Sequence, residues 1–455
     1  MANLHFQTAL IEDTWRDNVR ITTGDGLISA LSWDSPPETA EGPGDERHAI
    51  ALPGGTSLHG HAFQRGMAGL AEVRGPGADS FWSWREVMYR FLEGMTPDDL
   101  EAIAALLYME SLESGFTRIG EFHYLHHGPD GAAYDDPAEM AGRIAAAASA
   151  TGVGLTLLPV FYAHGGFGGA APSSGQRRFL NDLDGFAALL EGCDRHLANQ
   201  DGAVLGVAPH SLRAVTPEEL TVLAGLRPTD PIHIHIAEQG KEVDDCLAWS
   251  GARPVEWLLD NAAVDGRWCL VHATQTTPGE VLALARSGAV AGLCPITEAN
   301  LGDGIFDALP FVEAGGRLGV GSDSNVRISL PEELRLLEYG QRLTHKARNL
   351  LAPKGESTGR ALFDLAREGG AQALGVSGRG LVVGAPADIV SLKADHPLLL
   401  ARFGDALLDS WIFSADNGAV DCVWTGGRKR VEGGRHRDRS AIEARFARTL
   451  RRLLS

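Results

Sequence analysis

The sequence predicts an α/β fold, namely a (β/α)8 TIM-like barrel together with a small β-sandwich domain built from both chain termini. Eight apolar, strand-like segments recur along the middle of the chain, each followed by an amphipathic helical stretch or a long loop. Further strand-like segments lie at both ends of the chain. An open doubly wound sheet is the alternative, but such a sheet usually carries a glycine fingerprint after its first strand, so the barrel is favoured.

The length supports more than one domain, because 455 residues exceed the usual limit for a single hydrophobic core. We expect residues 1–48 and 380–437 to form the small β-rich domain, and residues 49–379 to form the barrel. Residues 438–455 are expected to form a C-terminal helix.

The expected barrel strands are short apolar runs. In chain order they are AIALPGGTSLH, GFTRIGEFHYL, VGLTLLPVFY, VLGVAPHSL, PIHIHIAE, WCLVHATQ, AVAGLCPI and RLGVGSD. The helices expected between them include PDDLEAIAALLYMESLESG, DPAEMAGRIAAAASATG and TPGEVLALARSG. The expected terminal strands are TALIEDTW, NVRITTG, GLISALSW, GAPADIVSLKAD and GAVDCVWTGGRKRVEGG, the last with a Gly-Gly hairpin turn.

Composition narrows the class of protein. The net charge of −19 argues against nucleic acid or an anionic membrane as a partner, although a local arginine can still hold a small anionic substrate. Five scattered cysteines without a C-x-x-C pair indicate free thiols in a reducing compartment. No apolar run approaches the roughly 18 residues of a membrane span, and the N-terminus lacks a basic segment followed by an apolar one. We therefore expect a cytoplasmic protein.

The first chemical signal is the pair His59 and His61, which follows an apolar approach and a Pro-Gly-Gly break. Side chains alternate along an extended segment, so the two imidazoles point the same way and form half of a metal site. An H-x-H pair by itself is weak evidence, because most such pairs are surface or core histidines. The interpretation therefore depends on ligands further along the chain.

A second H-x-H lies in PIHIHIAEQ. His235 is nearer the carboxyl end of this expected strand and is the predicted third ligand. His233 lies one layer deeper, where a hydrogen-bonded interior histidine is the better interpretation. Glu238 follows where the strand gives way to a loop, and the alternative for it is a carboxylate at a helix N-terminus.

His272 and Asp323 end two further apolar strands, in VHATQ and GVGSDSN. A buried imidazole or carboxylate without a partner costs free energy, and a cation would satisfy Asp323 and the histidines together. Nitrogen and oxygen ligands suit Zn2+, with Fe2+ or Mn2+ as alternatives. Residues 1–240 contain no lysine, which excludes a two-metal site bridged by a carboxylated lysine on an early strand, so one divalent metal is predicted.

This order of motifs (H-x-H, a later His-x-x-Glu, a further His and Gly-Ser-Asp) resembles the amidohydrolase superfamily, in particular its mononuclear deaminase branch. The resemblance spans nearly the whole chain and includes GRGLVVGAPADIVSL, which is similar to the return of that superfamily to its small β-domain. The segments LHGHAFQRGMAGLAE, EFHYLHH, GFGG with GQRRF, APHSLRAV and HIHIAEQ resemble the formimidoylglutamate deiminases of histidine degradation.

The resemblance implies hydrolysis of N-formimidoyl-L-glutamate, a small anionic substrate, to N-formyl-L-glutamate and ammonia, and it makes a homodimer plausible. The metal ligands that it implies are His59, His61, His235 and Asp323. The substrate-binding residues that it implies are Gln64, Tyr124, His210 and Arg213. From the residues alone, Arg213 offers a planar fork for a carboxylate, with a surface ion pair as the alternative.

The mechanistic hypothesis gives three residues catalytic roles. Asp323 takes the proton of the attacking water, which a metal has made more acidic. Glu238 hydrogen-bonds the imino nitrogen and relays a proton to it, and His272 stabilises charge on the attacking oxygen. A deaminase acting on a purine, pyrimidine or triazine ring is the nearest rival, and a non-catalytic barrel that binds metal or a partner is the rival of a different class.

Overall fold

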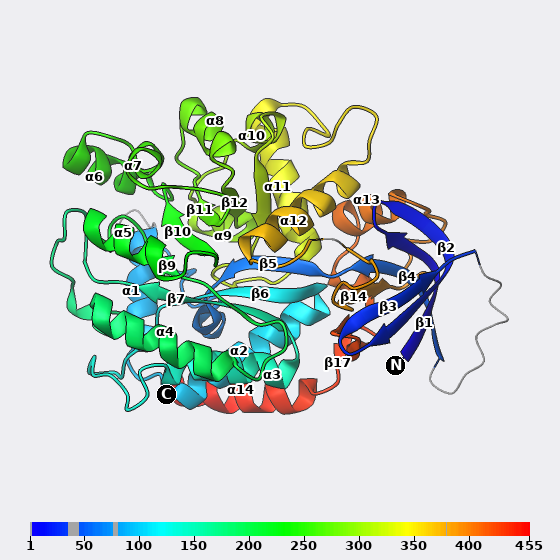
Figure 1. Cartoon of the computed structure of the whole chain (residues 1–455), viewed down its shortest axis with the longest axis horizontal. Coiled ribbons are helices and arrows are strands. Elements are labelled where there is room, and N and C mark those ends of the chain that lie inside the picture. The colour runs from blue at the N-terminus through cyan, green and yellow to red at the C-terminus, as the bar shows by residue number, and fades with distance from the viewer. Residues whose placement is uncertain (1, 35–44, 76–80, 379) are drawn as a thin grey trace.

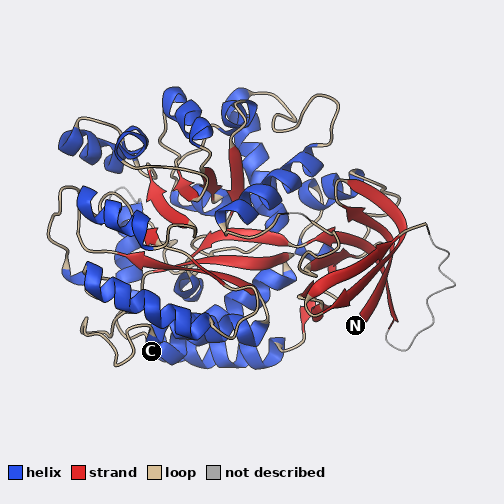
Figure 2. Ribbon diagram, viewed as in Figure 1, coloured by secondary structure: helices blue, strands red, loops and turns tan. Residues whose placement is uncertain are grey.

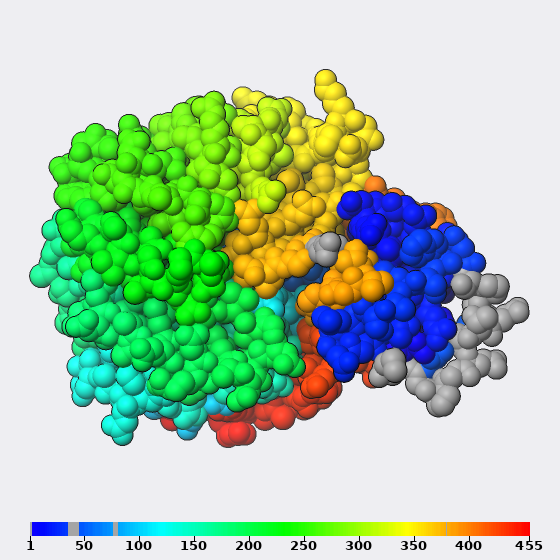
Figure 3. All heavy atoms as spheres, in the orientation of Figure 1, coloured from blue at the N-terminus to red at the C-terminus, as the bar shows by residue number. Residues whose placement is uncertain are grey.

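The structure is a computed structural model, and it describes residues 2–34, 45–75, 81–378 and 380–455. Figure 1 shows two parts lying side by side. In one part, helices surround a group of strands, and the other part is a sheet that contains the N-terminal strands. Figure 2 shows helices around the strands of the first part, while the second part is mostly strand. In the space-filling view the orange segment of the chain lies between the two parts (Figure 3).

The strands of the first part form two parallel sheets. The first runs in the order β5 (Gly55–Gly60), β6 (Phe116–His123), β7 (Gly154–Phe161) and β8 (Val204–Leu205), with β9 (Ala208–Pro209) also paired to β7. The second runs in the order β10 (Ile232–Ile236), β11 (Trp268–His272), β12 (Val290–Leu293) and β13 (Arg317–Val320).

Isolated parallel bridges join the two sheets at both seams. Gly60 pairs with Asp323 at one seam, and Val207 pairs with Ile232 at the other. The strands therefore follow one another around a ring, as the (β/α)8 prediction requires.

The helices lie in the connections between strands, except for α14, which follows the last strand. They are α1 (Phe81–Leu92), α2 (Pro97–Glu113), α3 (Glu139–Thr151), α4 (Leu183–Leu197), α5 (Pro217–Leu226), α6 (Gly240–Ser250), α7 (Pro254–Asn261), α8 (Pro278–Ser287), α9 (Pro295–Leu301), α10 (Ala308–Glu313), α11 (Leu330–His345), α12 (Thr358–Ala373), α13 (Ala406–Phe413) and α14 (Arg439–Leu453). The sequence marks several starts, because Thr96, Thr216 and Thr277 each precede a proline and form a capping box with an acidic residue three positions on.

Strands from both chain ends share one eight-stranded sheet. Its order is β17 (Arg435–His436), β16 (Arg428–Glu432), β15 (Val420–Thr425), β14 (Ile389–Leu392), β4 (Asp45–Pro53), β1 (Ala2–Ile11), β2 (Thr14–Gly24) and β3 (Leu27–Ser32). The expected hairpin turn lies at Gly426 and Gly427, with φ of +52° and +70°. The division into domains stays a prediction, and β4 crosses its expected boundary at residue 48 because the strand runs to Pro53.

Two expected strands differ from the structure in extent. The segment at 49–59 is divided at Gly54, where a Cβ atom would collide with Thr117, so β4 ends in the terminal sheet and β5 begins the ring. The segment at 204–212 is interrupted and forms the short strands β8 and β9. All five cysteines are buried and unpaired. Among the described residues, no helix combines the length and apolar character needed to cross a bilayer.

Candidate active site and metal centre

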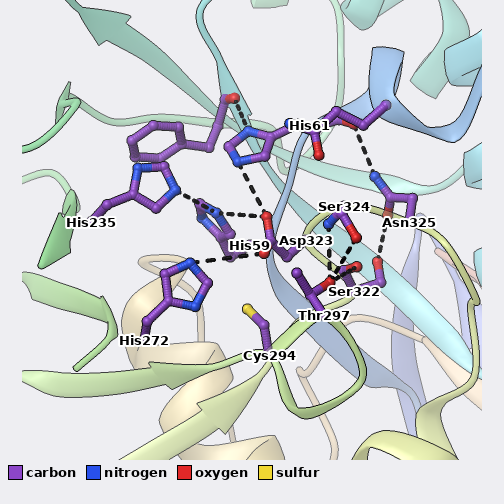
Figure 4. Close-up of polar contacts among 12 residues, drawn as sticks. His59, His61, His235, His272, Cys294, Thr297, Ser322, Asp323, Ser324 and Asn325 are labelled. Carbon is purple, nitrogen blue, oxygen red and sulfur yellow. Dashed lines mark hydrogen bonds and ion pairs between the residues drawn. The ribbon is translucent and has the colours of Figure 1, made fainter. Parts of the chain in front are cut away.

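The four predicted metal ligands meet at the carboxyl ends of the strands. The Nε2 atoms of His59 and His235 lie 3.1 Å apart, although the residues belong to opposite sheets of the ring. Oδ1 of Asp323 lies 3.2 Å from Nε2 of His61 and 3.5 Å from Nε2 of His59. Figure 4 shows these side chains pointing toward one another, and each residue is at most 5% exposed. The strand-end prediction therefore located a true convergence of side chains.

Backbone strain is concentrated at the same strand ends. Ala237, His272 and Asp323 adopt φ of +48°, +70° and +44°, although none is a glycine. Left-handed conformations of this kind cost free energy and cluster at active sites. Ala237 directly precedes Glu238, and the other two residues are themselves predicted to be catalytic.

Hydrogen bonds behind the rings orient two of the histidines. Nδ1 of His61 donates to the carbonyl oxygen of Phe122 at 2.8 Å, and Nδ1 of His235 donates to that of His210 at 3.1 Å. Because a carbonyl oxygen only accepts, each Nδ1 carries the proton and each Nε2 presents a lone pair to the shared space. Within the described part of the chain, Nδ1 of His59 has no hydrogen-bond partner.

The protonation states fit a cation at this point. Burial lowers the pKa of His59 to about 3 and holds the pKa of His235 well below its usual value, so both rings are neutral. Burial alone would raise the pKa of Asp323, but contacts with His59 and His61 hold it below its usual range. Neutral imidazoles and an ionised carboxylate are the ligand forms that a divalent metal requires, so the residues present fit a metal.

Glu238 and His272 flank this cluster. Nε2 of His272 lies 3.8 Å from Oε1 of Glu238 and 3.8 Å from Oδ2 of Asp323. Burial raises the pKa of Glu238. Burial opposes the charged form of His272, but Glu238, Glu298 and Asp323 together raise its pKa to about 10. A carboxyl group and an imidazole able to hold protons thus stand beside the metal ligands.

The four predicted substrate-binding residues line one pocket with this cluster. Nε2 of Gln64 donates to Tyr124 Oη at 2.9 Å, while its Oε1 is buried without a hydrogen-bond partner in the described structure. Arg213 is buried, and its Nη2 and Nε lie 3.9 and 4.0 Å from carboxylate oxygens of Glu238 and Glu242. Nε of Arg213 makes no hydrogen bond to described residues, so this guanidinium retains binding capacity.

Sequence reasoning missed the pocket wall contributed by α1. Its pocket-lining residues are Phe81, Trp84, Arg85, Met88 and Tyr89. Nε of Arg85 is buried without a hydrogen-bond partner in the described structure, and its guanidinium lies 4.6 Å from the ring centre of Trp82. The available signal was the segment FWSWREVMYRF, a helical aromatic stretch with two arginines, but it does not follow a strand directly.

The interior interpretation of His233 is confirmed. The side chain is buried, and Nε2 donates to the carbonyl oxygen of Ala373 at 2.7 Å. His233 therefore lies on the same strand as His235 but outside the cluster.

Comparisons with known proteins show the family to which the chain is similar. The amidohydrolase family model matches residues 50–430, and the model described as the N-terminal domain of formimidoylglutamate deiminase HutF matches residues 1–49. A formimidoylglutamate deiminase from Pseudomonas aeruginosa is 51% identical over 100% of both chains. An 8-oxoguanine deaminase from the same species is 28% identical, covering 90% of this chain and 89% of the relative.

Solved structures show the same fold. An amidohydrolase from Brucella melitensis has a TM-score of 0.95 and 56% identity over 100% of both chains. An adenosine deaminase from Xanthomonas campestris with bound zinc has a TM-score of 0.82 at 19% identity, covering 99% of this chain and 98% of that one. The chain therefore belongs to the amidohydrolase family and, within it, to the formimidoylglutamate deiminases.

Proposed function

We propose that this protein is a metal-dependent enzyme that hydrolyses N-formimidoyl-L-glutamate to N-formyl-L-glutamate and ammonia in histidine degradation. The full-length similarity to a formimidoylglutamate deiminase supports this activity. The observation that carries it is the placement of Arg213 in one buried pocket with Glu238, His272 and the histidine–aspartate cluster. A guanidinium can bind a carboxylate of the substrate, and the histidine–aspartate cluster lies in the same pocket, where the amidine group can react.

The metal site is proposed to hold one divalent ion, most suitably Zn2+, between His59, His61, His235 and Asp323. Their nitrogen and oxygen donors also accept Fe2+ or Mn2+. When bound, the metal would supply a Lewis acid that lowers the pKa of a water molecule toward about 7.

The remaining chemistry falls to three side chains. Asp323 accepts a proton from the water that attacks the formimidoyl carbon. Glu238, whose pKa is raised by burial, donates a proton to the imino nitrogen. Asp323 passes the proton that it took from the water to the same nitrogen, so that the carbon–nitrogen bond breaks and ammonia leaves. The hydroxyl proton of the adduct returns to Glu238 as the carbonyl group forms. Nε2 of His272 faces the space between Glu238 and Asp323, where it stabilises charge developing on the attacking oxygen.

Substrate binding is proposed to use both arginines of the pocket. N-formimidoyl-L-glutamate carries two carboxylates, and Arg213 and Arg85 offer one guanidinium for each. Gln64, Tyr124 and His210 contribute further polar groups to the wall of the same pocket. A flat uncharged ring would leave the unused N–H donors of both guanidinium groups without an acceptor, which disfavours the ring-deaminase alternative.

We further propose that the protein works as a homodimer in the cytoplasm, without nucleic-acid or membrane partners. Five buried, unpaired cysteines fit a reducing compartment, and the net charge of −19 disfavours polyanions.

The deciding experiment measures ammonia release by the metal-loaded protein from N-formimidoyl-L-glutamate and from 8-oxoguanine. We expect turnover of the first compound only. Turnover of 8-oxoguanine in its place would establish the ring-deaminase alternative. Turnover of neither by protein that holds one metal ion per chain would favour the non-catalytic barrel.

A further inference from the structure

A buried carboxylate that the proposed reaction does not use lies directly behind His272. Glu298 belongs to the first turn of α9 and is 6% exposed. Its Oε1 accepts a hydrogen bond from the backbone N–H of Cys294 at 2.8 Å and lies 3.3 Å from Nδ1 of His272. Cys294 lies beside His272 in Figure 4.

The opposite edge of the same ring faces the reaction space. Nε2 of His272 lies 3.8 Å from both Glu238 and Asp323. The backbone of His272 is in the left-handed region, a conformation that costs free energy for a residue other than glycine. The imidazole is therefore fixed between a carboxylate behind it and two carboxyl groups in front.

We propose that Glu298 is a positioning residue for His272. A carboxylate oxygen only accepts, so Nδ1 of His272 donates its proton to Glu298 and the ring is turned with Nε2 toward the reacting atoms. The same oxygen is held in place by Cys294 N–H, which prevents the carboxylate from following the ring. This role rests on the proposed function, because it concerns the orientation of a residue that acts in that reaction.

The chain provides a matched control for a purely structural role. Glu333, on α11, is also buried and also caps the start of α9, because its Oε2 accepts the N–H of Ile296 at 3.0 Å. Among the described contacts, Glu333 makes no hydrogen bond or ion pair with His272. Both glutamates support α9, and only Glu298 reaches the imidazole.

The kinetic test compares Glu298→Ala, Glu298→Gln and Glu333→Ala, with metal content and melting temperature measured for each variant. For Glu298→Ala we expect kcat to fall about 10- to 100-fold, with KM within threefold and one metal retained. Glu298→Gln keeps an acceptor oxygen, so its kcat is expected to be at least fivefold above that of Glu298→Ala. Glu333→Ala is expected to keep kcat within twofold even if its melting temperature falls.

Three results would overturn the proposal: an unchanged kcat in Glu298→Ala, an equal loss in Glu333→Ala, or a loss of kcat that follows loss of metal.

A double-mutant cycle tests whether Glu298 acts through His272. In a His272→Asn background, Glu298→Gln should change the remaining kcat less than twofold, because the residue through which Glu298 acts is gone. If the fold-losses in kcat of the two single variants multiplied in the double variant, Glu298 would have a structural role that is separate from His272.

A substrate-independent measurement separates this inference from the proposed function. In the resting enzyme we expect a downfield, hydrogen-bonded Nδ1–H proton resonance for His272, assigned by its absence from His272→Gln. The resonance should disappear in Glu298→Ala, or shift in Glu298→Gln if the alanine variant fails to fold. Its presence in a wild-type enzyme that releases no ammonia would refute the function and keep the contact, whereas its absence would refute the positioning role.

Discussion

The Nε2 atoms of His59 and His235 lie 3.1 Å apart, although 176 residues separate the two histidines in the chain. Nδ1 of His235 is already occupied by the carbonyl oxygen of His210, so its Nε2 faces His59 with a lone pair. Two ring nitrogens this close, with Asp323 beside them, form an arrangement that a shared cation stabilises.

The first prediction concerns metal content. We expect one divalent metal ion per chain, and we expect His235→Asn to lose it together with activity, because three remaining donors bind far more weakly. Chelation should abolish activity and lower the melting temperature, since a ligand that binds only the folded state stabilises it. Metal analysis and thermal unfolding measure both effects.

His233→Asn is the matched control, because His233 lies on the same strand but donates to Ala373 outside the cluster. It should keep its metal while losing some stability. If both variants retained a full equivalent of metal, His235 would not be a ligand.

A second prediction separates proton transfer from metal binding. Glu238→Gln should lower kcat by about 10²- to 10⁴-fold, the usual contribution of a general acid or base, while the metal remains bound. Asp323→Asn should lower kcat at least as strongly and also weaken the metal, because Asp323 contacts both His59 and His61. Turnover near the wild-type level in either variant would contradict these roles.

A third prediction concerns the contribution of the two pocket arginines to substrate affinity. Arg213→Ala and Arg85→Ala should each raise KM about 10- to 150-fold, because each loses a charge-assisted contact worth about 1.5–3 kcal/mol. Arg213→Lys should recover only part of the loss, since lysine lacks the planar fork. Arg227→Ala, at a surface ion pair with Asp230, is the control and should leave KM unchanged. An unchanged KM for Arg213→Ala would remove this residue from the substrate pocket.

Two helical glycines give opposite predictions for stability. A Cβ at Gly369 on α12 would collide with the backbone of Leu318, so Gly369→Ala should cost about 1–3 kcal/mol. A Cβ at Gly225 on α5 would instead enter open space, so Gly225→Ala should gain about 0.5–1 kcal/mol through helix propensity. Thermal unfolding of the two variants checks the difference, and equal shifts would show that α12 does not pack directly on β13.

The sequence alone determined the fold class and the residues that end the strands. Period-two alternation placed His59 and His61 on one face, and apolar runs that stop at a polar residue located His235, His272 and Asp323. These features are local, because the direction of a side chain on a strand follows from its position in that strand. Position along the strand likewise distinguished His235, near the carboxyl end, from His233, which lies deeper on the same strand.

The tertiary structure decided what local patterns cannot specify. Arg85 reaches the pocket from α1, and Glu298 reaches His272 from α9, so neither contact follows from the periodicity of its own segment. The first expected strand likewise divides at Gly54, where the distant side chain of Thr117 leaves no room for a Cβ atom. Which side chains meet across a ring of strands depends on how distant segments pack, because contact between them is set by the three-dimensional arrangement and not by their spacing in the chain.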